Sequence, residues 1–307
     1  RNWQGLLDIT TGLKGHWKLD ADANDFSGNS YHGVLTNGAT IDTNAGTNRI
    51  GPGKVSLDGV DDHVDLSAHQ GSFAALTQGT ISAWIKTSDA DGAIFAATDV
   101  ADANSYGSFW VWTGKLAWEV RENGTWLLDV ATTATVSDNA WRHVAVTVGA
   151  TGNKLYIDGV LQASLTYFTG NASTQQFFSN VSGIDFMAIG VDQNNSGLRH
   201  QFAGLIDDVR VYDRALSAAD ITELFGTGSY SLSGKVFEDI AGDALLDGAI
   251  GGANNPGVAS VAVSFYLDNG NGTPGAGDTL VVGSPVTTGA DGSYTSPAVP
   301  PGNYWVA

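Results

Sequence analysis

The sequence predicts an all-β protein built from two β-sandwiches. Three observations lead to this prediction: apolar and polar residues alternate along nearly the whole chain, 40 glycines supply turns, and only 15% of the residues are charged. Alternation with a period of two is the pattern of a half-buried strand. About a dozen short strands without a long helix are typical of sandwiches. The 307 residues, 42% of them hydrophobic, suffice for one or two cores.

The predicted strands follow one another at short intervals. The first covers residues 13–19, and residues 107–130 form three strands interrupted at Thr113-Gly114 and Asn123-Gly124. Both dipeptides favour tight hairpin turns. The other strands of this region are expected within residues 54–59, 63–66, 79–87, 92–97, 141–149, 154–159, 160–165, 184–190 and 202–212.

One short helix is predicted after residue 217. Ser217 can cap its N-terminus, Asp220 stands three positions later as in a shortened capping box, and Gly226 is expected to end it. The glycine- and serine-rich residues that follow divide the chain into a domain over residues 1–227 and a smaller β-sandwich over residues 228–307. The chain lacks an initiator Met and stops beside a strand, so we expect it to be a processed fragment of a longer protein.

Charge and composition exclude several classes of partner. A formal net charge of −18 argues against binding to nucleic acid and disfavours an anionic membrane surface. The chain has no apolar run of about 20 residues, so we expect no membrane insertion. It also has no cysteine, which excludes disulfides but leaves an extracellular location open. Calcium bound to acidic loops is then the expected brace.

Six stretches of the first domain follow one another in the order known from one family: GLKGHWKLDADANDFSGNSYHGVL, VSLDGVDDHVDL, TISAWIKT, WRHVAVTV, KLYIDGVL and GLIDDVRVYDRALSAADI. With them the domain resembles the concanavalin A-like jelly rolls, and among these the bacterial laminin-G-like modules. The resemblance implies a jelly-roll sandwich with a structural calcium ion between its first and last strands. It assigns Asp207 to this ion, and the neighbouring Asp208 is then expected to face elsewhere.

The partners of Asp207 are expected where the first strand ends and in the loop behind it. The resemblance implies Asp20, Asp25 and a backbone carbonyl near Asn29 or Gly33 as further ligands. An alternative stays open: Asp25 could form an Asx-turn and Asp207 could cap a bulge without any metal.

The second domain resembles the calcium-binding B domains of bacterial serine-aspartate-repeat surface adhesins, which implies a smaller immunoglobulin-like sandwich. The matching stretches are GKVFED, PGVASVAVSFYLDNGNG, GDT, ADGSY and PPGNYWV. Calcium takes six to eight oxygen ligands, and two acidic loops offer them, although Ala241 and Gly275 stand where an oxygen ligand is usual. The expected ligands are Asp239, Asp243, Asp247, Asp268, Asn271 and Asp278; alternatively these are only turn residues.

No arrangement of residues predicts catalysis. Hydrolysis of a glycosidic bond needs two carboxylates at a fixed separation, and glycosidases with this fold carry the pattern E-x-D-x-E on one strand. Glu119 and Glu122 come nearest, but their odd spacing places them on opposite faces of a strand. We therefore expect a protein that is not an enzyme.

Tryptophans offer a possible sugar-binding surface. Trp110 and Trp112 share one face of a strand whose other face carries Phe109 and Val111. If the latter pair faces the core, the tryptophans lie on a surface where a sugar ring can stack, and tryptophans on the neighbouring strands can extend it. The alternative is that the tryptophans fill the interior. The expected ligand-binding residues are Trp110, Trp112, Trp118 and Trp126.

These features predict a non-catalytic, extracellular or surface-anchored adhesion protein with calcium-stabilised sandwiches. Its expected partner is a carbohydrate or a protein on a surface. Two rivals stay open: a structural subunit that self-associates into an extracellular fibre, and a carbohydrate-binding module of a polysaccharide-degrading enzyme. The sequence does not identify the ligand, and it leaves open whether Lys235 forms an isopeptide bond.

Overall fold

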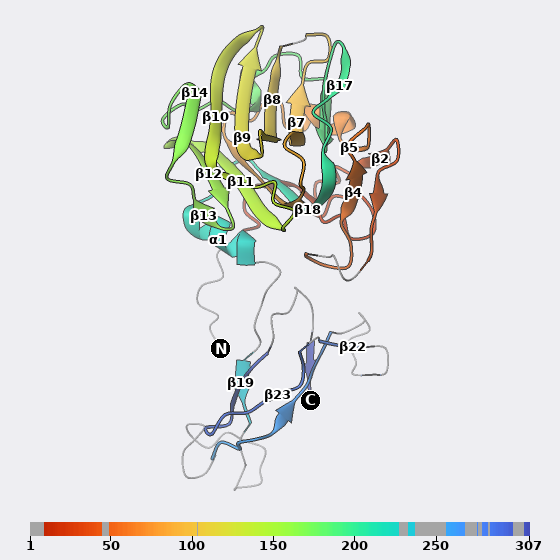
Figure 1. The fold of residues 1–307 in the computed structure, drawn as a ribbon, viewed down its shortest axis with the longest axis vertical. Coiled ribbons are helices and arrows are strands. Elements are labelled where there is room, and N and C mark those ends of the chain that lie inside the picture. Colours follow the sequence, from red (N-terminus) through yellow and green to blue (C-terminus); the bar gives the residue numbers. More distant parts are fainter. Residues whose placement is uncertain are drawn as a thin grey trace. The chain divides into compact units, whose positions relative to one another are not determined.

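Two compact units make up the chain, Arg1–Phe225 and Gly226–Ala307. The computed structural model describes residues 9–44, 49–102, 104–226, 233–236, 256–267, 275, 278–281, 283–296 and 304–307, and Figure 1 shows both units. Among these residues, no helix is both long and apolar enough to cross a membrane.

The first unit consists of two eight-stranded antiparallel sheets. The first sheet contains β1 (Leu13–Trp17), β3 (Thr40–Ile41), β4 (Val55–Asp58), β6 (Gly79–Lys86), β11 (Arg142–Gly149), β12 (Gly152–Ile157), β13 (Val160–Leu161) and β18 (Ala203–Tyr212). Its order is β13-β12-β11-β6-β18-β4-β3, and β1 pairs with the second half of β18.

The second sheet lies against the first. It contains β2 (Val34–Thr36), β5 (His63–Asp65), β7 (Gly92–Thr98), β8 (Tyr106–Trp112), β9 (Lys115–Glu122), β10 (Thr125–Thr135), β14 (Leu165–Thr169) and β15 (Phe186–Ile189). Its order is β14-β10-β9-β8-β7-β15-β5-β2. One continuous hydrophobic core joins the inner faces of both sheets, so the predicted all-β, jelly-roll sandwich is confirmed.

The strands end where the sequence predicts turns. Thr113-Gly114 separates β8 from β9, and Asn123-Gly124 separates β9 from β10. All four residues have positive φ angles, between 47° and 78°, which is the conformation that a two-residue hairpin turn of type I′ requires.

Shorter elements complete the first unit. They are the 3-10 helices η2 (Ser67–Ser72) and η3 (Phe178–Asn180), the hairpin β16 (Asp192–Asn194) and β17 (Gly197–Arg199), and the helix α1 (Ala218–Gly226). The predicted capping box is confirmed: Asp220 N–H donates to Ser217 Oγ at 3.1 Å, and Ser217 N–H donates to the Asp220 carboxylate at 2.9 Å.

The second unit is built from short antiparallel strand pairs. They are β19 (Ser233–Lys235) with β24 (Ser293–Thr295), β20 (Ala262–Val263) with β23 (Val286–Thr287), and β21 (Phe265–Leu267) between β22 (Thr279–Leu280) and β25 (Tyr304–Val306). Val263 and Phe265 are buried, and Phe265 packs on Tyr294.

Candidate functional site

Alternate residues of the second sheet point away from the core and form a surface that we call the outer face. On β8, Phe109 and Val111 are fully buried in the core. Successive side chains of a strand point to opposite sides, so Trp110 and Trp112 lie on the outer face. There they belong to a separate cluster with the small residues Ala93, Ala96, Ala117 and Ala131.

Pairing between strands determines which residues share the outer face. Residues directly opposite each other on neighbouring strands point to the same side. Tyr106 on β8 pairs with Arg121 on β9, and Arg121 pairs with Trp126 on β10. In the next row, Ser108 pairs with Glu119, and Glu119 pairs with Asp129. A row with two carboxyl groups therefore runs beside a row that contains aromatic rings.

Trp118 does not lie on this surface, which corrects the expected set of sugar-binding residues. It pairs with Phe109, is fully buried, and donates its indole N–H to Gln176 O at 3.2 Å. The two-residue turn at Thr113-Gly114 places Trp112 opposite Lys115, so residue 118 falls opposite a core residue. The residue spacing around this turn therefore predicts a core position for Trp118.

The outer face carries perpendicular aromatic pairs. Trp112 and Phe168 meet edge-on, with ring centroids 5.1 Å apart and an interplanar angle of 83°. Tyr106 and Trp126 meet at 6.2 Å and 89°. Phe168 is 53% exposed, whereas Trp110 is only 6% exposed. Rings at right angles do not form one flat platform, so Trp112, Phe168 and Trp126 offer separate apolar contacts.

Glu119 is a buried carboxyl group between these aromatic pairs. It is 5% exposed, and Tyr106 Oη donates to it across 3.5 Å. Burial, together with the nearby carboxylates of Asp129 and Asp192, raises the pKa of Glu119 to about 8. At neutral pH the group is therefore mostly protonated, and it can donate a hydrogen bond as well as accept one.

The hairpin β16–β17 covers one end of the outer face. Val191 and Leu198 pack on Phe186 and Ala188 of β15, which pair with Thr98 and Ala96 of β7. Beyond them, His200 meets Trp110 edge-on at 4.5 Å. The part of the face formed by β15 and β7 is therefore closed, while Trp112, Trp126 and Phe168 are partly exposed.

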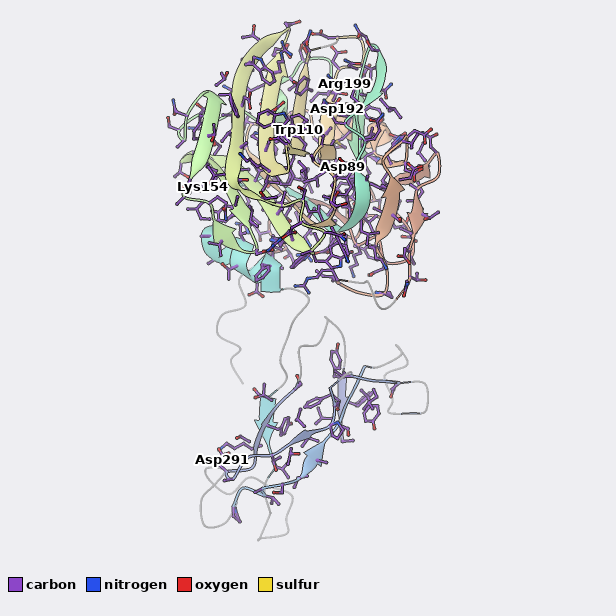
Figure 2. The ribbon with its side chains drawn as sticks, in the orientation of Figure 1. Asp89, Trp110, Lys154, Asp192, Arg199 and Asp291 are labelled. Carbon is purple, nitrogen blue, oxygen red and sulfur yellow. The ribbon has the colours of Figure 1, made fainter. Side chains whose placement is uncertain are left out.

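An ion pair fixes this hairpin. Arg199 Nη2 donates to both carboxylate oxygens of Asp192 at 2.9 Å, and the guanidinium lies 5.3 Å from the Tyr106 ring. Burial raises the pKa of Asp192 to about 6, although Arg199 acts in the opposite direction. Figure 2 shows Asp192 and Arg199 together near Trp110.

Glu122 takes no part in this surface. Its carboxylate accepts hydrogen bonds from Ser182 N–H at 3.0 Å and Ser182 Oγ at 2.5 Å. Glu119 instead has Asp129 as its cross-strand neighbour. Sequence reasoning missed this pair, and it also missed Tyr106, Phe168, Asp192 and Arg199.

The second candidate region is the junction of the first and last strands. Trp17 at the end of β1 pairs with Val209 of β18, which brings Asp20 toward Asp207. Asp207 is fully buried: its Oδ2 accepts Ile50 N–H at 3.0 Å, and its Oδ1 has no hydrogen-bond partner among the residues that the structure describes. Burial raises its pKa well above the usual range, and the Asp208 and Asp20 carboxylates add to the effect.

The Asp25 carboxylate is held by hydrogen bonds to β1 and to its own loop. Its two oxygens accept hydrogen bonds from the backbone N–H groups of His16, Ser27 and Tyr31 at 2.8–2.9 Å and from Ser27 Oγ at 2.8 Å. Burial opposes ionisation of Asp25, but these bonds hold its pKa below the usual range. The Asx-turn alternative therefore describes Asp25.

Two other expected ligands of this ion also have structural roles. The Asn29 side-chain amide donates to Leu13 O and Lys14 O at 3.3 and 3.0 Å. Gly33 N–H donates to Ala23 O at 2.8 Å, and a Cβ at Gly33 would collide with Val64. Both residues fasten the loop to its surroundings.

The neighbouring Asp208 has ion-pair partners of its own. Its φ of 49° marks an irregularity of β18, and its carboxylate pairs with His16 Nε2 at 2.6 Å and with Arg210 at 3.0 Å. The Asp208 charge nevertheless acts on both Asp207 and Asp20 and raises the pKa of each.

Few of the expected calcium ligands in the second unit can be placed. Asp239, Asp243, Asp247, Asp268 and Asn271 lie outside the described residues. Asp278 Oδ2 accepts Gly275 N–H at 2.8 Å and closes its own turn. Lys235 forms an ion pair with Asp291 at 2.8 Å.

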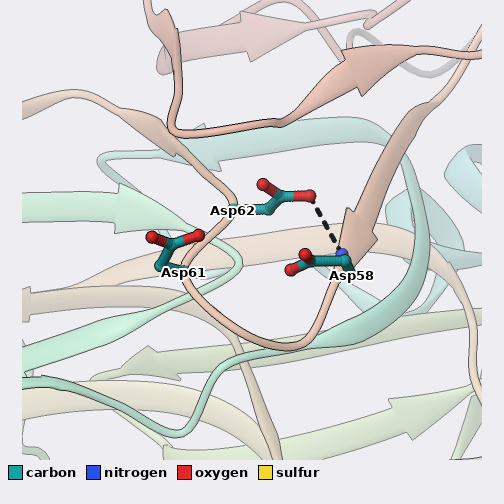
Figure 3. A group of neighbouring side chains, drawn as sticks. All are labelled: Asp58, Asp61 and Asp62. Atoms are coloured by element: carbon teal, nitrogen blue, oxygen red, sulfur yellow. Dashed lines mark hydrogen bonds between the residues drawn. The ribbon is translucent and has the colours of Figure 1, made fainter.

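A further acidic group lies in the turn between β4 and β5. One carboxylate oxygen from each of Asp58, Asp61 and Asp62 lies within 4.8 Å of the other two. Figure 3 shows the three side chains. Asp62 Oδ2 accepts Asp58 N–H at 3.1 Å, and Asp58 Oδ1 accepts Val60 N–H at 2.8 Å. These bonds shape the turn, and we assign no ion to it.

A cavity of about 310 Å³ opens beside β12, β13 and β14, away from the outer face. Asn153 supports it: its amide donates to Asn171 O and Thr174 O at 2.9 Å, and its oxygen accepts the Tyr167 hydroxyl at 3.0 Å. Lys154, labelled in Figure 2, is the charged residue of its lining.

Comparisons with known proteins place the fold. No curated protein matches the chain in sequence. Domain 4 of an extracellular arabinanase from Geobacillus stearothermophilus, solved with arabinotriose, is 23% identical with a TM-score of 0.52 over 69% of this chain and 97% of that one. The binding domain of a paraclostridial mosquitocidal protein is 18% identical with a TM-score of 0.52, over 71% of this chain and 52% of that one.

The family match covers most of the sandwich, from the end of β4 onward. The Laminin_G_3 family, described as the concanavalin A-like lectin/glucanases superfamily, matches residues 58–222. This range is more than half of the chain, and it contains β5 to β18, which include every strand of the second sheet except β2. The chain therefore belongs to the concanavalin A-like lectin/glucanases superfamily.

Proposed function

We propose that the first unit is a non-catalytic glycan-binding domain of an extracellular adhesion protein, and that the outer face holds the glycan. The observation that carries this proposal is the set of partly exposed rings, Trp112, Phe168 and Trp126, on either side of the row that contains Glu119 and Asp129. Aromatic faces provide apolar contact, and a small number of polar groups fix orientation. The arabinanase domain with arabinotriose gives an example of this fold with a short glycan.

The charges of the outer face favour an uncharged sugar. Arg199 is occupied by Asp192, and Arg121 lies 4.6 Å over the Trp126 ring. Glu119 and Asp129 would repel an anionic group placed between the aromatic pairs. The perpendicular rings suit a single soluble chain better than the flat surface of an insoluble polysaccharide.

Titration calorimetry with neutral trisaccharides tests the proposal. Arabinotriose, xylotriose, cellotriose, mannotriose and maltotriose are the probes, and we expect at least one to bind. Trp112→Ala and Phe168→Ala should each weaken that binding at least tenfold, which corresponds to about 1.4 kcal/mol.

Two matched variants locate the binding. Phe26 is 53% exposed, as Phe168 is, but lies in the loop after β1, so Phe26→Ala should leave the affinity unchanged. Lys154→Ala tests the cavity beside β14. Loss of binding in Lys154→Ala but not in Trp112→Ala would move the site to that cavity, and failure of all probes would refute the glycan proposal.

Hydrolysis is a second candidate, because Glu119 and Asp129 are cross-strand neighbours and their carboxyl groups lie on the same face of the sheet. Retaining glycosidases use two carboxyl groups about 5–5.5 Å apart, one of them protonated. We place binding first because Glu119 is 5% exposed and hydrogen-bonded to Tyr106. New reducing ends released from the probes, and lost in Glu119→Gln, would replace the binding proposal with hydrolysis.

A calcium ion at the strand junction is also part of the proposal. The residues fit such an ion, because the unpartnered Oδ1 of Asp207 is buried and the Asp20 carboxylate is near it. A cation bound to both would satisfy that oxygen and offset the repulsion between the carboxylates, and its chemistry there would be structural. We leave Asp25 out of the proposed ligand set because its two oxygens already accept four hydrogen bonds.

Thermal melting with calcium and with EDTA tests the ion. A ligand that binds only the folded state raises stability by mass action, so calcium should raise the Tm of the first unit. Asp207→Asn should abolish this rise, whereas Asp62→Asn, in the turn between β4 and β5, should retain it. Equal melting curves in calcium and EDTA would refute the ion.

For the second unit we propose a calcium-stiffened, immunoglobulin-like spacer of the B type. The support is the resemblance of its sequence together with its short antiparallel strands. In the full chain, a calcium response that remains after Asp207→Asn would come from this unit. If no calcium response remains in Asp207→Asn, calcium does not stabilise the second unit.

A further inference from the structure

The closed end of the outer face contains polar groups without partners. Among the described residues, Thr98 Oγ1 and Ser108 Oγ have no hydrogen-bond partner, although their residues are only 0% and 2% exposed. The buried Nε of Arg199 also has no partner. A buried hydroxyl that makes no hydrogen bond costs about 1–3 kcal/mol, so such groups are rare in folded proteins and call for an explanation.

These groups lie in neighbouring positions. Thr98 on β7 pairs with Tyr106 on β8, and the Arg199 guanidinium lies over the Tyr106 ring. Ser108 is two residues from Tyr106 on the same strand and pairs with Glu119. Three unpaired polar groups and one mostly protonated carboxyl group therefore gather where the hairpin β16–β17 covers the sheet.

We propose that this closed end is a subsite for the terminal unit of a neutral glycan, with Thr98, Ser108, Arg199 and Glu119 as its hydrogen-bonding groups. This inference rests on the proposed glycan-binding function. It adds that the site binds the end of a glycan chain and not an internal segment. The chain would continue from the subsite over β9 and β10 toward Trp112 and Phe168. The packing of Leu198 on Phe186 and Ala188 prevents a chain from continuing in the other direction.

If the subsite exists, removing its hydroxyls should stabilise the unliganded protein and weaken glycan binding. Thr98→Val and Ser108→Ala remove hydroxyls that have no partner in the free protein. Each should raise the Tm of the unliganded protein, by about 2–4 °C for a 150–250-residue domain, and weaken the binding trisaccharide about tenfold. A hydroxyl with a structural role would give the opposite change in Tm.

Thr132→Val is the matched control. Thr132 is a fully buried threonine of the same sheet, but its hydroxyl is used: it donates to Ala134 O at 2.8 Å and accepts Leu116 N–H at 3.1 Å. Its loss should lower the Tm and leave the affinity unchanged. If Thr98→Val lowers the Tm as Thr132→Val does, or leaves the affinity intact, the subsite is refuted.

Chain length separates this inference from the broader function. Calorimetry compares the trisaccharide that binds with the hexasaccharide of the same series. A terminal subsite predicts equal affinity per molecule, whereas a site for internal segments predicts a severalfold gain for the hexasaccharide. Such a gain refutes only the terminal subsite, while failure of every probe refutes the glycan-binding function itself.

Discussion

Two polar regions of the jelly roll use similar residues in opposite ways. In the loop after β1, the oxygens of Asp25 accept four hydrogen bonds, three of them from backbone N–H groups. On the outer face, Thr98 and Ser108 have no partners, and Glu119 is held at a raised pKa. The loop uses its polar groups to fix the backbone, whereas the hydroxyls of Thr98 and Ser108 fix nothing in the part of the chain that the structure describes.

The difference separates stability from function within one domain. Polar groups satisfied by the backbone stabilise the folded chain, and their removal leaves buried N–H groups unpaired. Unsatisfied polar groups lower stability and are retained where a ligand completes them. Substitutions in the two regions should therefore change stability with opposite signs.

The largest effect is expected at Asp25. Asp25→Ala removes four hydrogen bonds to a charged acceptor and should lower the free energy of unfolding by about 3 kcal/mol or more. Urea denaturation measures this loss, which should be equal in calcium and in EDTA. A loss seen only in calcium would show that Asp25 is a metal ligand after all.

A smaller effect of opposite sign is expected at Glu119. With a folded-state pKa of about 8 against an ordinary value of 4.5, the native protein binds more protons than the unfolded chain between these pH values. Stability therefore falls as the pH rises through this range. Glu119→Gln has no carboxyl group to ionise at this position, so it keeps the stability that the wild type loses. Its Tm should exceed that of the wild type by about 2 °C or more at pH 9.

The comparison at pH 5 and pH 9 isolates the carboxyl group. Glu223→Gln, on α1, makes the same change of charge and should follow the wild-type curve. Parallel curves for Glu119→Gln and the wild type would show that Glu119 is ionised in the folded state, and the polar row would then lose its hydrogen-bond donor.

The elements that depend on neighbouring residues were predictable from the sequence. Thr113-Gly114 and Asn123-Gly124 fix their hairpins through positive φ angles, and Ser217 with Asp220 caps the helix. The positions of Phe109 and Val111 follow from alternation once one face is buried. Each of these features is determined within a few residues of chain.

The candidate site was harder to predict because it depends on register. An unbroken two-residue hairpin at Asn123-Gly124 would place Leu128 opposite Glu119. A β-bulge between Trp126 and Leu128 shifts the pairing by one residue, so Asp129 faces Glu119 instead. A shift of one residue exchanges the two faces of a strand. The local sequence does not predict this bulge.

The smallest effect is expected at Asp22, which lies three residues before Asp25. Within the described part of the chain its carboxylate accepts hydrogen bonds only from Asn24, at 2.9 Å from N–H and 2.5 Å from Nδ2, in an exposed turn. Because water can replace such bonds, Asp22→Ala should change the free energy of unfolding by no more than about 0.5 kcal/mol. Urea denaturation beside Asp25→Ala gives the measurement. A loss comparable to that of Asp25→Ala would mean that the whole loop, and not one buried carboxylate, holds the first strand in place.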